Sequence, residues 1–385
     1  MKEYSLEELF DLQMGKTPFR DNPEYWSSGV NKWISIGDLS KCGKYISDTK
    51  EYISDKAVME SGISIIPAHT VVMSFKLSIG KTAITAEPMY SNEAIMSFHD
   101  KHVVDLLPDY IYYMFSAKDW DIGTNNAVMG KTLNKATLSK NKVRLHCMTE
   151  QQKIVKLLDK TQEMIVAHQR QLQKLDDLVK ARFVEMFGDP VSNPRGWEKH
   201  KLSDLADIRI GPFGSLLHKE DYVTDGHALI NPSHIINGKI AIDAELTVSD
   251  DKYTELSPYH LLIGDVVMGR RGEMGRCAVV CDSGLLCGTG SLLIRANGEL
   301  SADFIQKIIS FPSFKRTIED MAVGQTMPNL NVPIVSEFRI ISPPKDVQDQ
   351  YYAFVSQVDK SKLSVQQGLE KLETLKKSLM QQYFG

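Results

Sequence analysis

Two long stretches of the chain show an apolar pattern with a period of 3.5 residues. In residues 149–188 the apolar side chains recur at intervals of seven, seven, three, four and seven residues, and residues 346–385 show intervals of three, seven, four, three, seven and four. Such a pattern puts one apolar stripe on one face of a helix and is typical of helices that pair lengthwise. The stripe residues considered below are Leu158, Ile165, Leu172, Leu175 and Val179 in the first stretch and Val358, Val365, Leu369, Leu372 and Leu379 in the second.

The ends of the first stretch carry signals of a helix boundary. Thr149 with Gln152 three residues later forms a capping-box pattern, and Gly188 followed by Pro190 is typical of a helix end. At 1.5 Å per residue, an unbroken helix of about 38 residues would measure about 57 Å. We expect the two helices to pair with each other. The alternative is that each helix packs only on its own half of the chain.

The rest of the chain has a different texture. In residues 1–148 and 197–345, short apolar runs such as Val71–Met73 stand among Gly, Pro, Asn and Asp. Such runs are typical of strands and loops with a few short helices, so we expect α/β or α+β domains. Residues 189–196 lie between the first helix and the second domain and are predicted to be a linker.

The sequence repeats itself with a period of about 195 residues. Val71–Met73 recurs as Val266–Met268 at an offset of 195, Gly15 recurs as Gly211 at an offset of 196, and Thr132 recurs as Thr326 at an offset of 194. Offsets that drift so little along the whole chain indicate a duplicated unit with small changes in loop length. The predicted order of segments is a first domain in 1–148, a helix in 149–188, a linker in 189–196, a second domain in 197–345 and a helix in 346–385.

Composition and charge narrow the functional classes. The formal net charge of −4 argues against a chain that binds nucleic acid through bulk charge alone. The five cysteines include no C-x-x-C pair, which favours reduced thiols. The sequence lacks the roughly 20 consecutive apolar residues of a membrane span, and it begins with acidic residues where a secretory signal would be apolar. We therefore expect a cytoplasmic protein without membrane contact.

Motifs for catalysis are absent from the sequence. Gly-Lys-Thr occurs at 15–17, 80–82 and 130–132, but each copy lacks the glycine that a phosphate-binding loop needs five residues earlier. The ten histidines show no metal-ligand spacing, so no metal site is expected. Since no glycine-rich cofactor loop follows a strand, a self-contained modifying enzyme is disfavoured.

Several duplicated segments together resemble a known family. In the first domain they are Gly15–Pro18, Trp33–Leu39 and Ser74–Lys81, and in the second they are Gly211–Ser215, Arg270–Arg276 and Gln325–Asn331. Their order and duplication resemble the DNA-specificity subunit of type I restriction-modification systems over essentially the full chain. The first domain departs from this pattern in its last loop, where Gly130–Lys135 lacks the Pro-Asn-Leu-Asn of Pro328–Asn331.

The resemblance implies a function and a set of partners. Each α/β domain would be a target-recognition domain that reads one half of a bipartite site in double-stranded DNA. The helices would form an antiparallel coiled-coil spacer along which two methyltransferase subunits dock, which makes the ten stripe residues candidates for partner binding. Restriction endonuclease and translocase subunits would join the complex. The chain itself would be non-catalytic and bind no cofactor, with S-adenosylmethionine, ATP and Mg²⁺ on the partner subunits.

The matching loops of the two domains supply the candidates for DNA contact. Polar side chains read base edges, while phosphate contacts fix position. The candidates are Lys16, Thr17, Arg20, Lys76, Lys81, Lys131, Thr132 and Asn134 in the first domain and Ser215, His218, Lys219, Arg270, Arg271, Arg276, Gln325, Asn329 and Asn331 in the second. Solvated surface charge is the alternative for the lysines and arginines, and a capping or turn role is the alternative for the asparagines. The alternative function is a coiled-coil scaffold without DNA readout.

Overall fold

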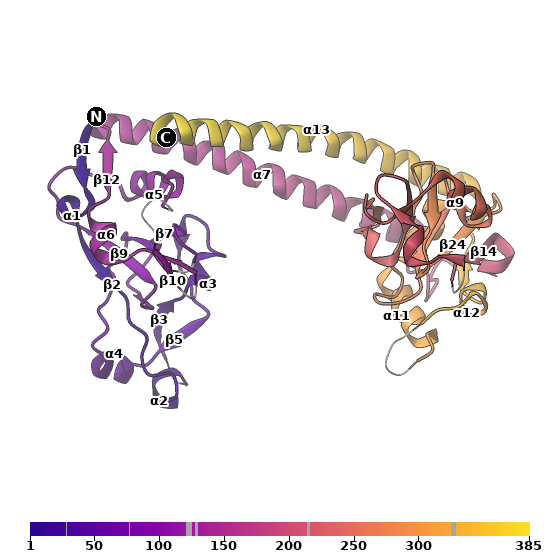
Figure 1. Ribbon diagram of the computed structural model, residues 1–385, viewed down its shortest axis with the longest axis horizontal. Coiled ribbons are helices and arrows are strands. Elements are labelled where there is room, and N and C mark those ends of the chain that lie inside the picture. The colour runs from indigo at the N-terminus through magenta and orange to yellow at the C-terminus, as the bar shows by residue number, and fades with distance from the viewer. Residues whose placement is uncertain (28, 77, 121–124, 128–129, 214–215, 325–328) are drawn as a thin grey trace. The chain divides into compact units, whose positions relative to one another are not determined.

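The computed structural model describes residues 1–385 except 28, 77, 121–124, 128–129, 214–215 and 325–328, and the side chains of 125–127 and 130–132 also lie outside the description. The described chain divides into two compact units. Unit 1 contains Met1–Leu172 and Ser364–Gly385, and unit 2 contains Gln173–Leu363. Each unit therefore holds one mixed domain together with part of both long helices (Figure 1).

The elements from the start of the chain to the end of the first long helix, whose last part belongs to unit 2, are mostly short strands and helices. They are β1 (Lys2–Ser5), α1 (Leu6–Leu9), β2 (Phe10–Met14), α2 (Pro23–Trp26), β3 (Asn31–Ile34), α3 (Ile36–Leu39), β4 (Tyr45–Ile46), β5 (Glu51–Ile53), α4 (Asp55–Ser61), β6 (Val71–Ser74), β7 (Thr82–Thr85), β8 (Tyr90–Ser91), β9 (Ile95–Asp100), α5 (Pro108–Ala117), β10 (Asn125–Ala127), β11 (Gly130–Thr132), α6 (Lys135–Ser139), β12 (Lys142–Leu145) and α7 (Met148–Phe187).

Unit 2 follows the same plan and ends in the second long helix. Its elements are β13 (Lys199–Lys201), α8 (Leu202–Leu205), β14 (Ala206–Ile210), η2 (Lys219–Asp221), β15 (Tyr222–Val223), β16 (His227–Ile230), η3 (Pro232–His234), β17 (Ile235–Ile236), β18 (Lys239–Ile240), β19 (Thr247–Val248), α9 (Asp250–Glu255), η4 (Ser257–Tyr259), β20 (His260–Leu261), β21 (Val266–Gly269), β22 (Cys277–Val279), β23 (Leu285–Cys287), β24 (Ser291–Ala296), α10 (Ala302–Ile309), α11 (Pro312–Met321), α12 (Val332–Ser336), β25 (Arg339–Ile341) and α13 (Lys345–Phe384).

The sheets of the two units are connected alike. The strand order β2-β9-β6-β7-β4 in unit 1 corresponds to β14-β24-β21-β22 in unit 2. A second sheet in each unit contains one parallel pair, in which Trp33 lies opposite Tyr90 and Leu229 lies opposite Leu286. Leu229 follows Trp33, and Leu286 follows Tyr90, by the same 196 residues in the sequence. The predicted duplicated α/β fold is therefore confirmed.

Gly15 and Gly211 show why glycine recurs after the first strand of each sheet. The Gly15 N–H donates to the Ile95 carbonyl at 3.1 Å, and the Gly211 N–H donates to the Ser291 carbonyl at the same distance. A Cβ atom at Gly15 would lie 2.3 Å from the Asn92 carbonyl oxygen, which real side chains do not tolerate. The backbone can approach the neighbouring loop this closely only without a side chain.

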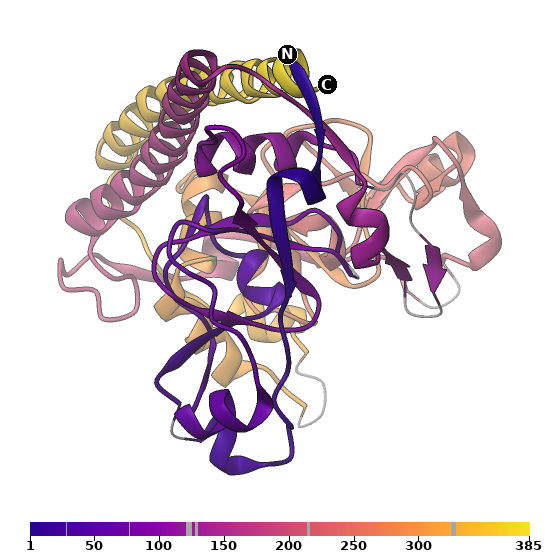
Figure 2. The ribbon, with the colours of Figure 1, turned by 90° about the vertical axis from the view of Figure 1, so that its left-hand side faces the viewer.

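The two long helices run antiparallel within each unit. In successive contacts between the helices, the residue numbers rise along α7 and fall along α13. Figures 1 and 2 show the two helices side by side. The contacting pairs are Gln162 with Lys376 and His168 with Gly368 in unit 1, and Asp176 with Lys362 and Phe183 with Tyr351 in unit 2. The predicted pairing of the helices is confirmed. No helix in the described part of the chain is both long and apolar enough to cross a membrane.

Each helix pair also packs on the domain of its own unit. In unit 1, Leu158 and Leu379 join a core with Tyr110 and Phe115 of α5. In unit 2, Phe187 stacks edge-on against Phe304 of α10, with ring centroids 5.0 Å apart. The helices therefore bury apolar surface against each other and against the domains. Both alternatives, pairing of the helices and packing of each helix on a domain, are thus present.

The start of α7 differs from the prediction, whereas its end agrees with it. The helix begins at Met148 and not at Thr149, because the Cys147 carbonyl accepts from the N–H groups of Glu150 and Gln151. The Thr149–Gln152 pattern is thus displaced from the helix boundary. At the other end, Gly188 has φ of +74° and its N–H donates to the Val184 carbonyl at 2.9 Å. This left-handed residue ends the helix as glycine commonly does.

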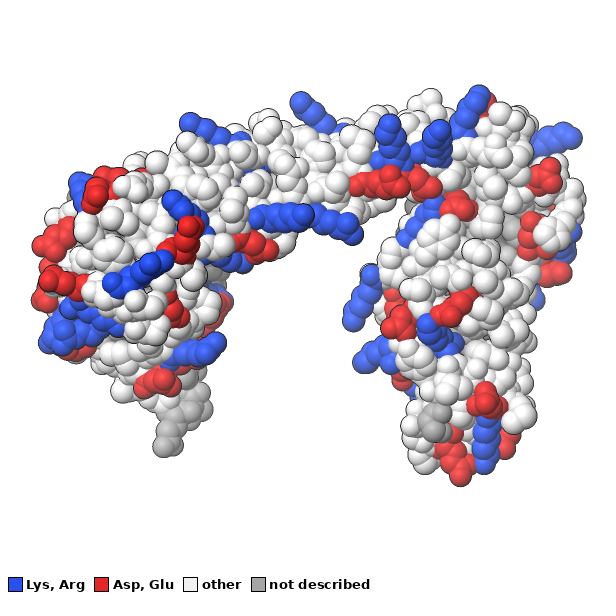
Figure 3. Space-filling view, turned by 180° about the vertical axis from the view of Figure 1, so that it is seen from behind, with Lys and Arg blue, Asp and Glu red and all other residues white. Residues whose placement is uncertain are grey.

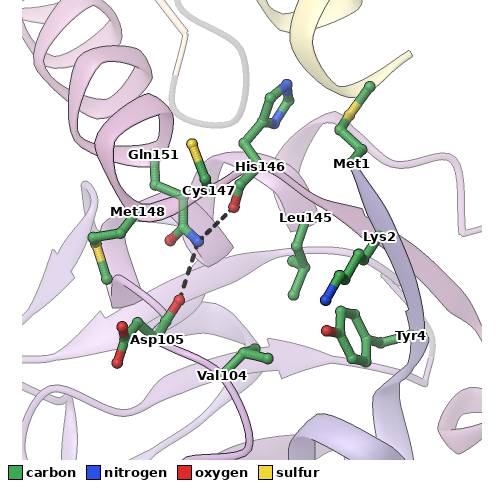
Figure 4. A pocket seen from close by; sticks show the side chains of 10 residues that line it. All are labelled: Met1, Lys2, Tyr4, Val104, Asp105, Leu145, His146, Cys147, Met148 and Gln151. Carbon is green, nitrogen blue, oxygen red and sulfur yellow. Dashed lines mark hydrogen bonds between the residues drawn. The ribbon is translucent and has the colours of Figure 1, made fainter.

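A buried glutamine ties the start of α7 to the domain of unit 1. The Gln151 side chain is 1% exposed, and its Nε2 donates to the carbonyl oxygens of His146 at 3.0 Å and Asp105 at 3.2 Å. Its Oε1 accepts from the Leu107 N–H at 3.1 Å. Figure 4 shows the amide between the carbonyls of Asp105 and His146. The amide therefore joins the helix to the loop before α5.

The same device recurs at the start of α13. The Gln348 side chain is 3% exposed, and its Nε2 donates to the carbonyl oxygens of Pro343 at 2.9 Å and Glu299 at 3.5 Å. Its Oε1 accepts from the Ser301 N–H at 3.4 Å. Both glutamines are the fourth residue of their helix. The sequence carries no signal for this pair, because two of the three partners of each glutamine lie more than 40 residues away in the chain.

Candidate nucleic-acid interface

Equivalent backbone bonds place two loops side by side in each unit. In unit 1 the Leu133 N–H donates to the Phe75 carbonyl at 3.0 Å, and in unit 2 the Leu330 N–H donates to the Arg270 carbonyl at 2.9 Å. Leu133 and Leu330 are buried, and they anchor the segment before α6 or α12 against the β6–β7 or β21–β22 loop. Each unit therefore presents a composite surface made of these two loops.

Unit 2 gathers two arginines and an asparagine on this surface. Asn329 Oδ1 accepts from Arg270 Nε at 3.2 Å and from Arg271 Nε at 3.5 Å. Arg270 Nε also donates to the Leu330 carbonyl at 3.2 Å. Within the described residues, these contacts leave the terminal nitrogens of both guanidinium groups without a partner. That arrangement suits two-pronged binding of a base edge or a phosphate.

The electrostatics of this pair favour an acceptor from outside the chain. The pKa of Arg270 is lowered by burial and by the positive charge of Arg271. Within the described residues, no carboxylate pairs with either guanidinium group. Because a partly buried cation without a counter-charge is costly, an electron-rich ligand at this position would be stabilising.

Arg276 stands on the same loop but has a different environment. Its Nη2 pairs with Glu273 Oε2 at 3.0 Å, and its Nη1 donates to the Pro232 carbonyl at 3.1 Å. Glu273 also pairs with Lys315 at 2.7 Å. These contacts hold the β21–β22 loop against η3 and α11, so Arg276 has a structural role there. Its contact with DNA stays a prediction.

The matching loop of unit 1 carries lysines. Lys76 is half-buried, and its Nζ lies 5.2 Å from the centre of the Phe75 ring. Lys81 Nζ donates to Ser40 Oγ at 2.7 Å, and the Lys81 N–H donates to Ser74 Oγ at 3.1 Å. Phe75 and Lys76 thus occupy the positions of Arg270 and Arg271, and the two composite surfaces differ in chemistry.

The candidates after β2 are bound within their own unit. Lys16 Nζ donates to the Ser61 carbonyl, and Thr17 Oγ1 donates to Glu93.

Arg20 forms the strongest of these internal contacts. Its two terminal nitrogens contact the two carboxylate oxygens of Glu51 at 2.5 and 3.1 Å. The guanidinium also lies 4.0 Å from the centre of the Trp26 ring and 4.7 Å from that of Trp33. Arg20 therefore supports the packing of unit 1, and its contact with DNA stays a prediction.

The corresponding segment of unit 2 is more open. His218 and Lys219 are exposed, and the His218 N–H donates to Asp221 Oδ2 at 2.7 Å. Ser215 lies outside the described residues. Figure 3 shows lysine and arginine side chains interspersed with aspartate and glutamate on the face that it draws. On this face, DNA would therefore be contacted by individual lysine and arginine side chains and not by one continuous positive surface.

The asparagines before α6 and α12 are helix caps. Asn134 Oδ1 accepts from the Thr137 N–H at 2.7 Å, and Asn331 Oδ1 accepts from the Ile334 N–H at 2.9 Å. The capping alternative considered for these residues is therefore present in both units. Contact with DNA through their remaining amide groups stays a prediction.

The structure also corrects the alignment of these loops. Leu133 and Asn134 match Leu330 and Asn331 at an offset of 197, whereas the sequence matched Thr132 with Thr326 at 194. The first unit thus keeps the Leu-Asn of the motif, and Thr132 corresponds to Asn329. The side chains of Lys131 and Thr132 and the whole of Gln325 lie outside the described residues.

The stripe residues proposed for partner binding face the interior of each unit. Leu158, Ile165, Val358, Leu369 and Leu379 are at most 9% exposed. The half-buried members are Leu172, Leu175, Val179, Val365 and Leu372. Their principal contacts are within this chain, and contact with a partner subunit stays a prediction.

A different set of apolar side chains faces outward from α7. Leu157, Met164 and Leu178 are 39%, 42% and 46% exposed. Leu157 and Met164 both lie in unit 1 and are separated by seven residues, so they share one face of the helix, whereas Leu178 lies in unit 2. Sequence analysis did not single out this face, although its heptad spacing was a detectable signal.

Comparison with known proteins identifies the family. A family model described as type I restriction modification DNA specificity domain matches residues 1–176 and again residues 194–374. Two matches that together cover most of the chain correspond to the two units of the fold. The chain therefore belongs to the type I restriction-modification DNA-specificity family.

The relatives support this assignment. The specificity subunit of type I restriction enzyme MjaIX from Methanocaldococcus jannaschii is 23% identical over an alignment of 403 positions, which covers 97% of this chain and 90% of the relative. The specificity subunit of EcoR124I/EcoR124II from Escherichia coli is 27% identical over 154 residues, which cover 38% of this chain and 37% of the relative.

Solved structures show the same fold at low sequence identity. The S subunit of a type I restriction-modification system from M. genitalium aligns with a TM-score of 0.54 and 11% identity, over 98% of this chain and 94% of its own. A chain from a structure described as the basis of complex assembly and conformational transition of the type I R-M system aligns with a TM-score of 0.67 and 13% identity, over 100% and 97%.

Proposed function

We propose that this chain is the specificity subunit of a type I restriction-modification complex and that its two domains read different halves of a bipartite DNA target. One observation carries this proposal. The two composite surfaces share their backbone framework but differ in the side chains that it presents. Arg270 and Arg271 in unit 2 stand where unit 1 has Phe75 and Lys76. Base readout depends on those side chains. Two domains with the same backbone framework but different loop side chains are therefore suited to reading two different half-sites.

The arginine pair is the part of the interface with the clearest chemistry. An arginine that donates two parallel hydrogen bonds matches the O6 and N7 acceptors of guanine in the major groove. In unit 2, Asn329 holds both Nε atoms and leaves the terminal nitrogens available. We propose that Arg270 and Arg271 contact base edges of one half-site and that Asn329 orients them.

The helix pair is the proposed platform for the partner proteins. Because the predicted stripe residues are used within the chain, the exposed α7 face of Leu157 and Met164 in unit 1 offers the apolar contact that a partner needs. We propose that methyltransferase subunits dock on the helix pair through this face and that restriction subunits join through them. The chain would contribute no catalytic group, and S-adenosylmethionine, ATP and Mg²⁺ would bind to the partners.

The proposal is tested with the assembled complex and a duplex that carries its target. The target is found by mapping the methylated adenines that the complex produces in genomic DNA. Arg270→Ala combined with Arg271→Ala should weaken binding to the target by about 1–3 kcal/mol for each lost two-pronged contact. Binding to an unrelated duplex should change much less. Arg339→Ala serves as the control, because Arg339 is exposed and lies on β25, away from the composite surface.

Exchange of one domain distinguishes DNA recognition from the alternative function, a coiled-coil scaffold without DNA readout. Replacement of residues 1–148 with the equivalent domain of a relative should change one half of the target and leave the other half unchanged. A protein scaffold without DNA readout would show equal affinity for all duplexes, before and after the exchange. A change in both halves would contradict modular readout.

A further inference from the structure

Unit 2 contains a cavity whose lining is strongly basic. Its volume is about 690 Å³, and it is bounded by the hairpin β17–β18, the β21–β22 loop, α10, α11 and α13. The charged residues of its lining are the cations Lys239, Arg276, Lys307, Lys315 and Lys362 and the anion Glu273. The described lining therefore has a clear excess of positive charge.

The carboxylates near the cavity are already engaged. Glu273 pairs with Arg276 at 3.0 Å and with Lys315 at 2.7 Å, so one acid serves two cations. Lys362 is neutralised from outside the lining, because Asp176 lies 2.6 Å from its Nζ. Lys239 and Lys307 have no carboxylate within salt-bridge distance among the described residues. The excess charge thus resides chiefly on these two lysines.

Lys307 distinguishes the cavity from a group of exposed surface lysines, because its side chain is partly buried. It is half-buried on α10, and its pKa is lowered by burial and by the charges of Lys180 and Lys362, which together outweigh the opposing charge of Asp176. An ammonium group that is partly desolvated and surrounded by other cations is unfavourable, and a bound anion would offset that cost. The environment of Lys307 therefore calls for an anionic ligand.

The matching position in unit 1 shows that the fold itself does not require this cavity. Tyr113 is the sixth residue of α5, as Lys307 is of α10. Its hydroxyl donates to Asp159 Oδ1 at 2.6 Å, and Lys44 Nζ pairs with the same oxygen at 2.6 Å. Lys44 also pairs with Asp109. Unit 1 thus neutralises its charges internally, whereas unit 2 leaves a cationic cavity.

The other walls of the cavity add neutral donors. Asn237 and Gly238 form the turn of the hairpin β17–β18, and their φ angles of +51° and +75° are typical of a two-residue Asn-Gly turn. Asn237 and the hydroxyl-bearing Ser310 are part of the lining. Lysine ammonium groups with nearby amide and hydroxyl groups form a usual environment for a phosphate.

We propose that this cavity binds a phosphate group of the DNA backbone beside the half-site contacted by Arg270 and Arg271. The β21–β22 loop connects the two features, since Arg270 and Arg271 lie at its start and Arg276 lines the cavity at its end. This shared loop favours DNA over a free anion or an acidic protein surface. The inference rests on the proposed reading of DNA by this loop, and it adds a positioning contact that has no equivalent in unit 1.

Chemical footprinting of lysines tests the ligand directly. The full complex is acylated at low reagent concentration and the modification of Lys307 and Lys239 is followed by mass spectrometry. Target duplex should protect both lysines, whereas inorganic phosphate at the same phosphate concentration should not. Equal protection by inorganic phosphate would overturn the assignment to DNA in favour of a free-anion site. Protection by the partner subunits in the absence of DNA would assign the cavity to a protein contact.

Variants then measure the contribution of the contact. Lys307→Met combined with Lys239→Met should weaken target and unrelated duplexes by a similar factor, about three- to tenfold at moderate salt. The dependence of log affinity on log salt concentration should become shallower by about one for each lost phosphate contact. Lys360→Met is the matched control, since Lys360 is exposed on α13 and is not part of the lining.

The two proposals fail in different ways. If the unmodified complex does not discriminate between target and unrelated duplexes, the proposed reading of DNA fails whatever the lysine variants do. If the complex discriminates but the double lysine variant matches Lys360→Met in affinity and salt dependence, the cavity is not a phosphate site. Lys307→Tyr, which introduces the residue of unit 1, checks that any loss reflects charge and not misfolding.

Discussion

Gln151 and Gln348 illustrate how much a single buried side chain contributes to this fold. Each amide satisfies two carbonyl groups and one N–H group that would otherwise lie unpaired at the junction of a domain and a long helix. Leaving such groups buried without partners costs about 1–3 kcal/mol each. The two glutamines therefore fix the angle at which each helix leaves its domain.

Replacement of Gln151 should destabilise unit 1. Gln151→Leu keeps a similar volume but abolishes all three hydrogen bonds, so we expect the free energy of unfolding to fall by about 2–4 kcal/mol. Urea or thermal unfolding of the full chain measures this change. Gln152→Leu is the control, because the neighbouring Gln152 is exposed, and it should change stability by less than about 0.5 kcal/mol. Equal losses in the two variants would contradict the role assigned to Gln151.

The cysteines should differ sharply in reactivity. Burial raises the pKa of the Cys277 thiol to about 12 and raises the pKa of the Cys287 thiol as well. A raised pKa keeps a thiol protonated, and the thiolate is the reactive form, so at pH 8 only about one Cys277 in 10⁴ would be ionised. The exposed Cys147 and Cys281 should therefore be alkylated rapidly in the native protein. Mass spectrometry should find Cys277 and Cys287 modified only after denaturation, and rapid native modification of either would contradict this prediction.

Short helices next to the candidate DNA-contact loops depend on their caps. Asn331 Oδ1 accepts the Ile334 N–H at the start of α12, and loss of such a cap costs about 0.5–2 kcal/mol. Asn331→Ala should therefore lower the free energy of unfolding by about 1 kcal/mol. Asn331→Asp retains an acceptor oxygen and should stay within about 0.5 kcal/mol of the unmodified chain. If aspartate destabilises as much as alanine, the side chain acts through its amide nitrogen and not as a cap.

Elements that depend on local sequence could be predicted, and those that depend on distant partners could not. The 3.5-residue stripe fixed the two long helices, and Gly188 marked the end of α7, because both signals lie within a few residues of their effect. Arg20, in contrast, looked free in the sequence, yet Glu51 binds it from 31 residues away. The alignment of the loop around Thr132 failed because a change in loop length shifted the match by three residues.

The duplication also explains which parts of the candidate site could be inferred. A framework position such as Gly15 or Gly211 repeats because the backbone approach that it permits is the same in both units. Positions on the candidate DNA-contact loops differ, as Phe75 differs from Arg270. Repetition therefore identifies the scaffold, and departure from repetition marks the surface that we propose to confer specificity. The cationic cavity of unit 2 is such a departure, because Lys307 stands at the helix position that Tyr113 occupies in unit 1.

The helix pair connects the two proposed readers, so its length should set the spacing of the half-sites. The contacts between α7 and α13 continue in antiparallel order in both units, from Gln162 with Lys376 to Phe183 with Tyr351. A seam of this kind accepts insertions only when both helices gain whole heptads at the same level. The level of Leu172 in α7 corresponds to that of Ser364 in α13, where the two compact units also meet in the sequence.

Insertion of seven residues after Leu172 together with seven residues before Ser364 should therefore lengthen the preferred gap between half-sites. At 1.5 Å per residue each helix grows by about 10 Å, which corresponds to about three base pairs of B-DNA at 3.4 Å each. Three base pairs also rotate one half-site about the DNA axis, so we expect weaker binding along with the longer gap. Two residues inserted in α7 alone turn its remaining stripe by about 200°, which should break the seam and prevent assembly with the partner subunits. Mapping the methylated sites of each variant complex measures the gap between the half-sites. An unchanged gap after the double heptad insertion would show that the length of the helices does not set the distance between the half-sites.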